Sequence, residues 1–174
     1  MYTFANNTLY VYIVSDLASP IGTYGRRDLC FSGMTSDDRL YLGGESKLRI
    51  FKVASSLNQP PLTPVIVVST KKAVIKIVRV GNELLLGELA GYLEVLDIKT
   101  STITSTYKFT SCEDTHIRDI VAIDDSRFLL ASQTGILKTT KDQEIKLYKK
   151  FDPLCLCHVT DSIYLVSSLS FFNL

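Results

Sequence analysis

Short apolar segments recur along the chain at a constant spacing, and this spacing limits the possible folds more than any other feature. Three of them begin their apolar runs 44 residues apart, at Leu40, Leu84 and Phe128. These segments read RLYLGG at 39–44, ELLLGE at 83–88 and RFLLAS at 127–132. A weaker copy, SIYLVSS at 162–168, begins its apolar run 35 residues after Phe128. Self-similarity at a fixed period of this size indicates a repeat protein.

Every copy has similar neighbours, which define the repeat as a meander of short strands. An apolar segment and then a turn-forming cluster precede each copy, and two further segments follow the first three copies. The clusters are Ser36-Asp37-Asp38, Gly81-Asn82, Asp124-Asp125-Ser126 and Thr160-Asp161. Asp, Asn and Gly tolerate the backbone angles of tight hairpins. Four antiparallel strands in about 44 residues are typical of one β-propeller blade.

The leucine-rich copy at 83–88 could belong to a buried helix or to a strand. An amphipathic helix needs apolar residues at i, i+3, i+4 and i+7 over a long window, and the closely spaced turn clusters leave no such window. We therefore predict an all-β chain. The uninterrupted run Leu84-Leu85-Leu86 predicts a strand that neighbouring blades cover on both faces.

The repeat predicts one propeller domain, or part of one, over residues 1–174. Full blades are expected at 28–69, 73–110 and 115–151, with partial blades at 8–25 and 154–174. The first partial blade would supply a third and a fourth strand, and the second would supply a first and a second strand. Pairing of the two would close a four-bladed ring without exposed edges. The alternatives are that the chain is a fragment of a propeller, or that it is part of a larger propeller that another chain completes.

The third blade resembles the repeats of the WD40-like propeller superfamily. In THIRDIVAIDDSRFLLASQTGILKTT, at 115–140, His116 matches the structural His of the family, although Thr115 replaces the usual Gly. Val95-Leu96-Asp97 lies where the family has its hydrophobic-Trp-Asp ending, yet this chain contains no Trp. The resemblance implies a scaffold that binds other proteins within a larger complex and has no catalytic residues.

The resemblance also implies which loops share one face of the ring. In the family, the loops between blades and the loops between the second and third strands lie together, and binding residues are often carried on loops of a rigid scaffold. The candidates are Arg26, Arg27, Lys71, Lys72, Asp114 and His116 from the first set, and Lys47, Glu88 and Gln133 from the second. We expect this mixed-charge rim to bind protein.

Charge and cysteine content narrow the other classes of function. Nineteen basic and eighteen acidic residues give a net charge of +1, which disfavours nucleic acid and anionic membranes as partners. The lysine-rich segment 141–150 with Tyr148 leaves single-stranded nucleic acid as a third hypothesis. The N-terminus lacks the pattern of a signal peptide or a membrane span. Four cysteines without framework spacing predict a cytoplasmic or nuclear protein.

The clusters that resemble chemical sites all have simpler structural interpretations. On a strand, Cys155 and Cys157 would point to one side and His158 to the other, which opposes a zinc site, so we expect the cysteines in the core. Asp37-Asp38 and Asp124-Asp125 occupy equivalent turns. Gly43-Gly44 predicts a turn or bulge rather than a phosphate loop. We therefore expect no metal and no cofactor. A ligand or enzyme site at the central channel, assembled from several blades, is the alternative.

Overall fold

The computed structural model describes residues 2–5, 8–11, 22–25, 30–56, 58–109, 116–124, 127–132, 135–140, 144–149, 153–160 and 163–168. Within these ranges the chain consists of antiparallel strands joined by turns, and it contains no helix. No helix that could span a membrane is therefore found among these residues. The predicted all-β class is confirmed.

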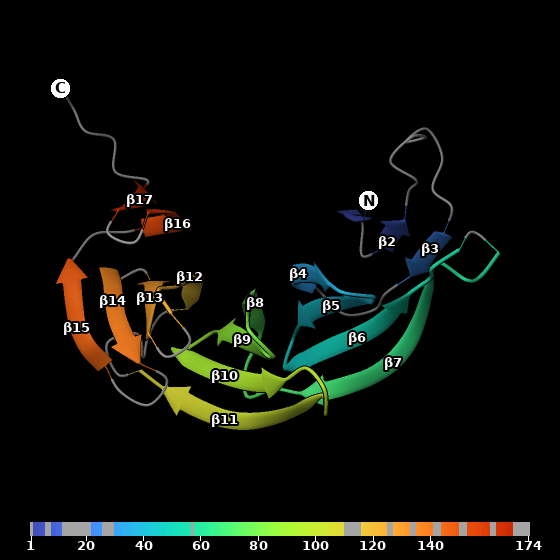
Figure 1. Ribbon diagram of the computed structural model, residues 1–174, viewed down its shortest axis with the longest axis horizontal. Helices are drawn as coiled ribbons and strands as arrows, with labels where there is room; N and C mark the ends of the chain where they lie inside the picture. The colour runs from blue at the N-terminus through green and yellow to red at the C-terminus, as the bar shows by residue number, and fades with distance from the viewer. Residues whose placement is uncertain are drawn as a thin grey trace.

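Three four-stranded meanders form the centre of the molecule (Figure 1). The first contains β4 (Cys30–Ser36), β5 (Arg39–Gly44), β6 (Lys47–Val53) and β7 (Leu62–Ser69). The second contains β8 (Val74–Val80), β9 (Glu83–Glu88), β10 (Tyr92–Asp97) and β11 (Thr102–Lys108). The third contains β12 (Ile117–Ala122), β13 (Arg127–Ser132), β14 (Gly135–Thr140) and β15 (Glu144–Lys149). We refer to these sheets as blades 1, 2 and 3.

Two smaller sheets lie at the ends of the arc in Figure 1. One contains β1 (Tyr2–Ala5), β2 (Thr8–Val11) and β3 (Gly22–Gly25), and the other contains β16 (Pro153–Thr160) and β17 (Ile163–Ser168). β1 is an additional strand, because the sequence predicted only two strands in 8–25. β1 pairs with β2 as an antiparallel edge strand, from Tyr2 opposite Val11 to Ala5 opposite Thr8. Among the described residues the two end sheets remain separate, so the pairing that would close a four-bladed ring is not seen there.

The first strand of each blade lies on the inner side of the arc. β4 contacts β8, β8 contacts β12, and β12 contacts β16. The remaining strands follow in sequence order toward the outside, so that β7, β11 and β15 are the outermost strands. The lysine-rich segment around Tyr148 therefore belongs to an outer strand. This radial order is that of propeller blades around an axis.

The leucine run of β9 is buried on both faces, as the sequence predicted. Leu84 and Leu86 pack with blade 1 residues such as Tyr41 and Ile50, whereas Leu85 packs with residues of blade 3 such as Phe128. Leu84, Leu85 and Leu86 each have 0% exposure. Alternate side chains of a strand point to opposite faces. A strand between two neighbouring blades therefore needs apolar residues at every position.

Small residues in the second strand of a blade allow the next blade to approach closely. A Cβ atom on Gly87 would lie 2.9 Å from Ile117 Cγ2, and one on Gly43 would lie 2.8 Å from Val74 Cβ. Gly43 and Gly44 lie within β5, so they do not form the turn or bulge that the sequence indicated. The bulge lies in the paired strand β4, where the register shifts between Cys30 and Ser32. The absence of a side chain at Gly43 and Gly87 permits the contact between blades.

The inner strands share a bulge near their beginning, which aligns Ser32, Lys76, Asp119 and Cys155. Asp119 is 4% exposed and connects blades 2 and 3 and the β16–β17 sheet. Its Oδ1 lies 2.7 Å from Lys76 Nζ, and its Oδ2 accepts a hydrogen bond of 2.8 Å from the Leu156 backbone N–H. Cys155, expected in the core, is exposed. The prediction was wrong because its strand lies on the inner side of the arc and not between blades.

Candidate functional site

Turns and loops from three blades are linked by backbone hydrogen bonds into one rim. The Thr70 N–H donates to the Ser46 carbonyl over 3.0 Å, which joins the β7–β8 loop to the β5–β6 turn. The Leu89 N–H donates to the Ala73 carbonyl over 3.1 Å, and Leu89 also forms a β-bridge with His116. We call the segments 45–47, 70–73, 89–91 and residue 116 the loop rim. Because adjacent loops brace each other, their exposed side chains are held on a fixed surface.

Five of the nine predicted site residues lie on the loop rim or directly below it. Lys47, Lys71 and Lys72 are exposed, and His116 is half-buried beside Arg118, whose Nε donates to His116 Nε2 over 3.4 Å. Glu88 precedes Leu89 at the end of β9. The other four candidates, Arg26, Arg27, Asp114 and Gln133, lie outside the described residues. Leu89, which the sequence did not single out, is 37% exposed and adds an apolar side chain to a basic surface.

A pair of buried glutamates supports the rim from below. Glu88 Oε2 accepts a hydrogen bond of 2.6 Å from the Lys72 N–H, and Glu94 Oε2 accepts one of 3.3 Å from the Lys71 N–H. Thr106 Oγ1 donates to Glu94 Oε1 over 2.9 Å. Glu88 is 0% and Glu94 3% exposed. Their carboxyl groups thus fix the backbone of the loop that carries Lys71 and Lys72.

Glu88 is protonated at neutral pH. Burial, followed by the hydrogen bond with Glu94 and the charge of that group, raises the pKa of Glu88 to about 9, although the Lys72 N–H opposes this shift. Two buried carboxylates in contact cannot both ionise without a large cost. Glu88 Oε1 has no N–H or hydroxyl partner.

The placement of Glu88 corrects the sequence-based expectation of an exposed rim residue. Glu88 ends the second strand of its blade, as Gly44 and Ser132 do in theirs. This position faces the loop that leads to the first strand of the same blade, so the Glu88 side chain turns inward. Glu94 was missed altogether. Its signal was an acidic residue flanked on both sides by apolar residues in the strand YLEVLD, since charged residues are rarely buried unless they are paired.

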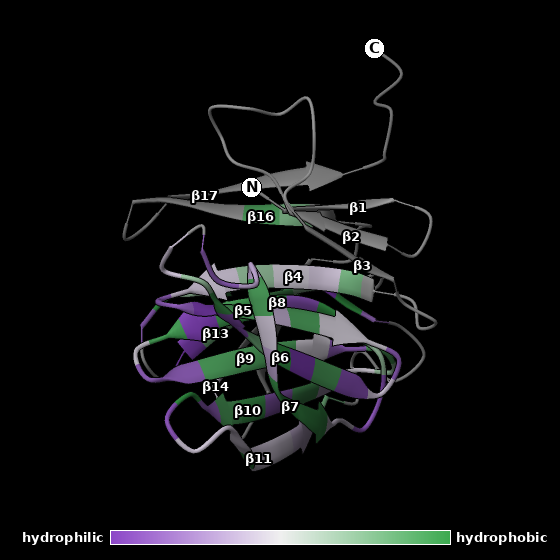
Figure 2. Cartoon of the chain, turned by 90° about the vertical axis from the view of Figure 1, so that its right-hand side faces the viewer, coloured by the Kyte–Doolittle hydropathy of each residue, from purple (hydrophilic) through white to green (hydrophobic). Residues whose placement is uncertain are grey.

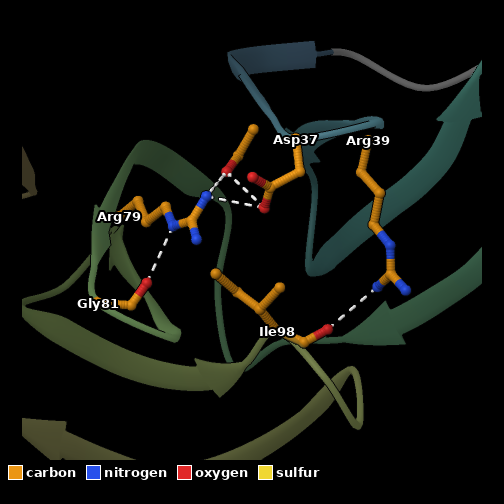
Figure 3. Close-up of polar contacts among 6 residues, drawn as sticks. Asp37, Arg39, Arg79, Gly81 and Ile98 are labelled. Carbon is orange, nitrogen blue, oxygen red and sulfur yellow. Dashed lines mark hydrogen bonds and ion pairs between the residues drawn. The ribbon is translucent and has the colours of Figure 1, made fainter.

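The opposite face of the blades carries ion pairs that fasten blade 1 to blade 2 (Figure 3). Arg79 Nη1 lies 2.8 Å from Asp37 Oδ2 and Arg79 also binds the Ser36 hydroxyl, while its Nε donates to the Gly81 carbonyl over 2.9 Å. Arg39 Nη1 reaches across to the Ile98 carbonyl over 3.0 Å. Asp37, at φ +53°, occupies the predicted turn. These side chains already make contacts that hold blades 1 and 2 together, so we assign this face a role in stability and not in binding.

Comparison with known proteins identifies the fold without identifying a family. No protein-family model matches the sequence, and no curated protein matches it. A crystal structure of the computationally designed Ika4 protein superimposes with a TM-score of 0.63 and 12% identity, covering 83% of this chain and 88% of that one. The WD40 repeats of RRP9 superimpose with a TM-score of 0.61 and 9% identity, covering 76% of this chain.

The chain folds as β-propeller blades. The four-stranded meanders, their radial order and the likeness to solved WD40 repeats agree on this point. This chain spans 43% of the length of the RRP9 chain. At identities this low the likeness concerns the fold alone, and function must be argued from the residues of the site.

Proposed function

We propose that this protein is a non-catalytic interaction module of the WD40-like type, which binds another protein through the loop rim as part of a larger complex. The observation that carries the proposal is the braced basic rim, on which Lys71 and Lys72 are exposed while their backbone is held by buried Glu94 and Glu88. A surface whose backbone is ordered before binding loses little conformational entropy on association.

The composition of the rim favours a protein partner with an acidic surface. Lys47, Lys71 and Lys72 supply positive charge, and Leu89 supplies an exposed apolar contact at the same place. Complementary charge steers association and gives specificity. Cytoplasm or nucleus is the compartment that we propose, because the four cysteines lack framework spacing.

The proposal includes a partner chain that completes the ring. In the described part of the chain, the end sheets contain three and two strands, where the central blades contain four. Strands from another chain would satisfy the backbone groups at these edges. Such a partner would bind by strand pairing at the ends of the arc, at a place separate from the loop rim.

Affinity capture from the native cells, followed by mass spectrometry, tests the rim. The full chain is compared with the double variant Lys71→Glu/Lys72→Glu and with Lys99→Glu, an exposed lysine in the β10–β11 turn on the opposite face. We expect the rim variant to lose specific partners that the wild type and the Lys99 variant both retain. Recovery of the same partners by all three proteins would refute the assignment of the rim.

A further inference from the structure

The outer strand of blade 1 exposes aliphatic residues at a sheet edge. Val65, Ile66 and Val67 are 51%, 42% and 56% exposed, and they lie in the outermost strand β7, whose apolar residues are green in Figure 2. The equivalent strands differ in chemistry, since β11 reads TITSTYK and β15 reads EIKLYK. Polar and lysine-rich edges resist strand addition, whereas an apolar edge favours it. β7 is the outer strand without that protection.

The backbone of β7 offers hydrogen-bonding groups along part of this edge. The Thr70 N–H points to the Ser46 carbonyl, and the register pairs Ser69 with Lys47 and Val67 with Arg49. Backbone groups alternate in direction along an antiparallel strand, so those of Val67 and Ser69 point away from β6. Pro64, which lacks an N–H, and the bulge at Val65 limit regular pairing to residues 66–69.

The charges of the segment that runs from β6 to the β7–β8 loop have one sign. Residues 47–72 contain five lysines and arginines and no acidic residue. Three exposed lysines mark the two ends of β7: Lys52 pairs with Thr63 at one end, and Lys71 and Lys72 follow Ser69 at the other. A strand added to this edge would therefore meet positive charge at both of its ends, which favours acidic side chains.

A pocket adjoins the Thr63 end of the edge. It has a volume of about 320 Å³ and is lined by residues that include Lys52, Ala54, Pro60 and Thr63. Its walls combine the apolar surface of Ala54 and Pro60 with the Lys52 side chain.

We propose that β7 is a docking edge for an extended segment of another protein in which acidic and aliphatic residues alternate, and that this segment adds to blade 1 as a fifth strand. Main-chain hydrogen bonds to Val67 and Ser69 give affinity, and the lysines at both ends select acidic side chains. A second copy of this chain is a poorer occupant. Two antiparallel β7 edges would place Lys71 and Lys72 of one copy near Lys52 of the other, and these like charges repel.

The edge at residues 66–69 lies outside the loop rim, although Lys71 and Lys72 serve both proposals. Variants at Val67 and Ser69 keep both lysines, so they test the edge separately from the rim. A fluorescently labelled, end-capped peptide of eight residues in which Asp alternates with Val is titrated with the full chain at low salt, and fluorescence anisotropy reports binding. The first control peptide replaces every Asp by Lys. The second carries N-methyl groups on alternate backbone amides, which removes donors at one edge while keeping the charge.

We expect saturable binding of the Asp-Val peptide, and an affinity lower by about tenfold or more for each control peptide. Equal binding of the Lys-Val peptide, equal binding of the N-methylated peptide, or no binding of the Asp-Val peptide overturns the proposal. So does dimerisation of the chain that Val67→Lys abolishes, because β7 would then pair with a second copy.

Variants of the chain locate the binding edge. Val67→Glu places a negative charge at the edge, which repels the acidic peptide, and Ser69→Pro removes one outward N–H without disturbing a bond to β6. Both should weaken binding by about tenfold. Thr104→Glu is the control, because Thr104 is exposed on the equivalent strand β11, and its affinity should equal that of the wild type. Thermal unfolding verifies that each variant folds, and loss of binding in Thr104→Glu contradicts the assignment to β7.

Discussion

Replacing Glu88 by Gln should remove a large part of the pH dependence of this protein's stability. Glu88 is 0% exposed, and its carboxyl group lies between the Lys72 N–H and the carboxyl group of Glu94. The amide of Gln has nearly the same shape, accepts from the Lys72 N–H through its oxygen, and donates to Glu94 through its nitrogen. The Glu88→Gln variant therefore keeps the contacts and loses only the ionisation.

The magnitude follows from the two pKa values of Glu88. The usual value of 4.5 applies to the unfolded chain, and the native value is about 9. The proton on Glu88 stabilises the native state. This stabilisation is fully present below the pKa of Glu88 in the unfolded chain, and it is lost as pH rises through the pKa of Glu88 in the native state. Between these values the native state holds one proton more than the unfolded state, so the free energy of unfolding falls by about 1.4 kcal/mol per pH unit. From pH 6 to pH 8 this amounts to at most about 2.7 kcal/mol.

Urea unfolding at pH 6, 7 and 8, followed by far-ultraviolet circular dichroism, measures this effect. The stability of Glu88→Gln should change less with pH than that of the wild type, so the difference between the two proteins should grow in favour of the variant as pH rises. Glu45→Gln is the matched control, because Glu45 is an exposed carboxylate in a turn of the same rim. Parallel pH profiles of wild type and Glu88→Gln would refute the raised pKa of Glu88.

Two further substitutions test how the blades are joined. Gly87→Ala should lower the free energy of unfolding by about 1–3 kcal/mol, because the new Cβ would lie 2.9 Å from Ile117 Cγ2. Gly33→Ala should lower it less in the same urea titration, because its Cβ would lie 3.2 Å from Leu42 Cδ2 and 3.7 Å from the Tyr41 carbonyl oxygen. Asp119→Ala should also destabilise the protein by about 1–3 kcal/mol, since it removes the acceptor of the buried Ile120 and Leu156 N–H groups and the partner of Lys76. Asp37→Ala, which breaks an ion pair in which Asp37 is 64% exposed, is the control and should change stability little; equal losses in the two Asp variants would contradict the role of Asp119.

The local features of the fold could be predicted from the sequence. Hairpin turns such as Gly81-Asn82 and the continuous apolar run Leu84-Leu85-Leu86 depend on residues near each other in the chain. Backbone angles in a turn and the alternation of side chains along a strand are properties of a few adjacent residues. Repetition at 44 residues then assembled these local signals into four-stranded blades.

The candidate site could be predicted only in part. The sequence, with the help of the WD40-like resemblance, placed Lys47, Lys71 and Lys72 on one face, because strand order fixes which loops meet. It gave no indication that Glu88 turns inward toward Glu94, since that contact depends on how the inter-blade loop packs against the ends of β9 and β10.

The sequence by itself determined the strands, the turns and their repetition, since each follows from interactions within one blade. Only the tertiary structure decided the burial of Glu88, the exposure of Cys155 and the contacts that Asp119 makes with the two neighbouring sheets. The same is true of the open aliphatic edge at Val65 and Val67. In each case the physical reason is the same: exposure and charge pairing depend on neighbours from other blades, which are distant in sequence and are brought close by packing alone.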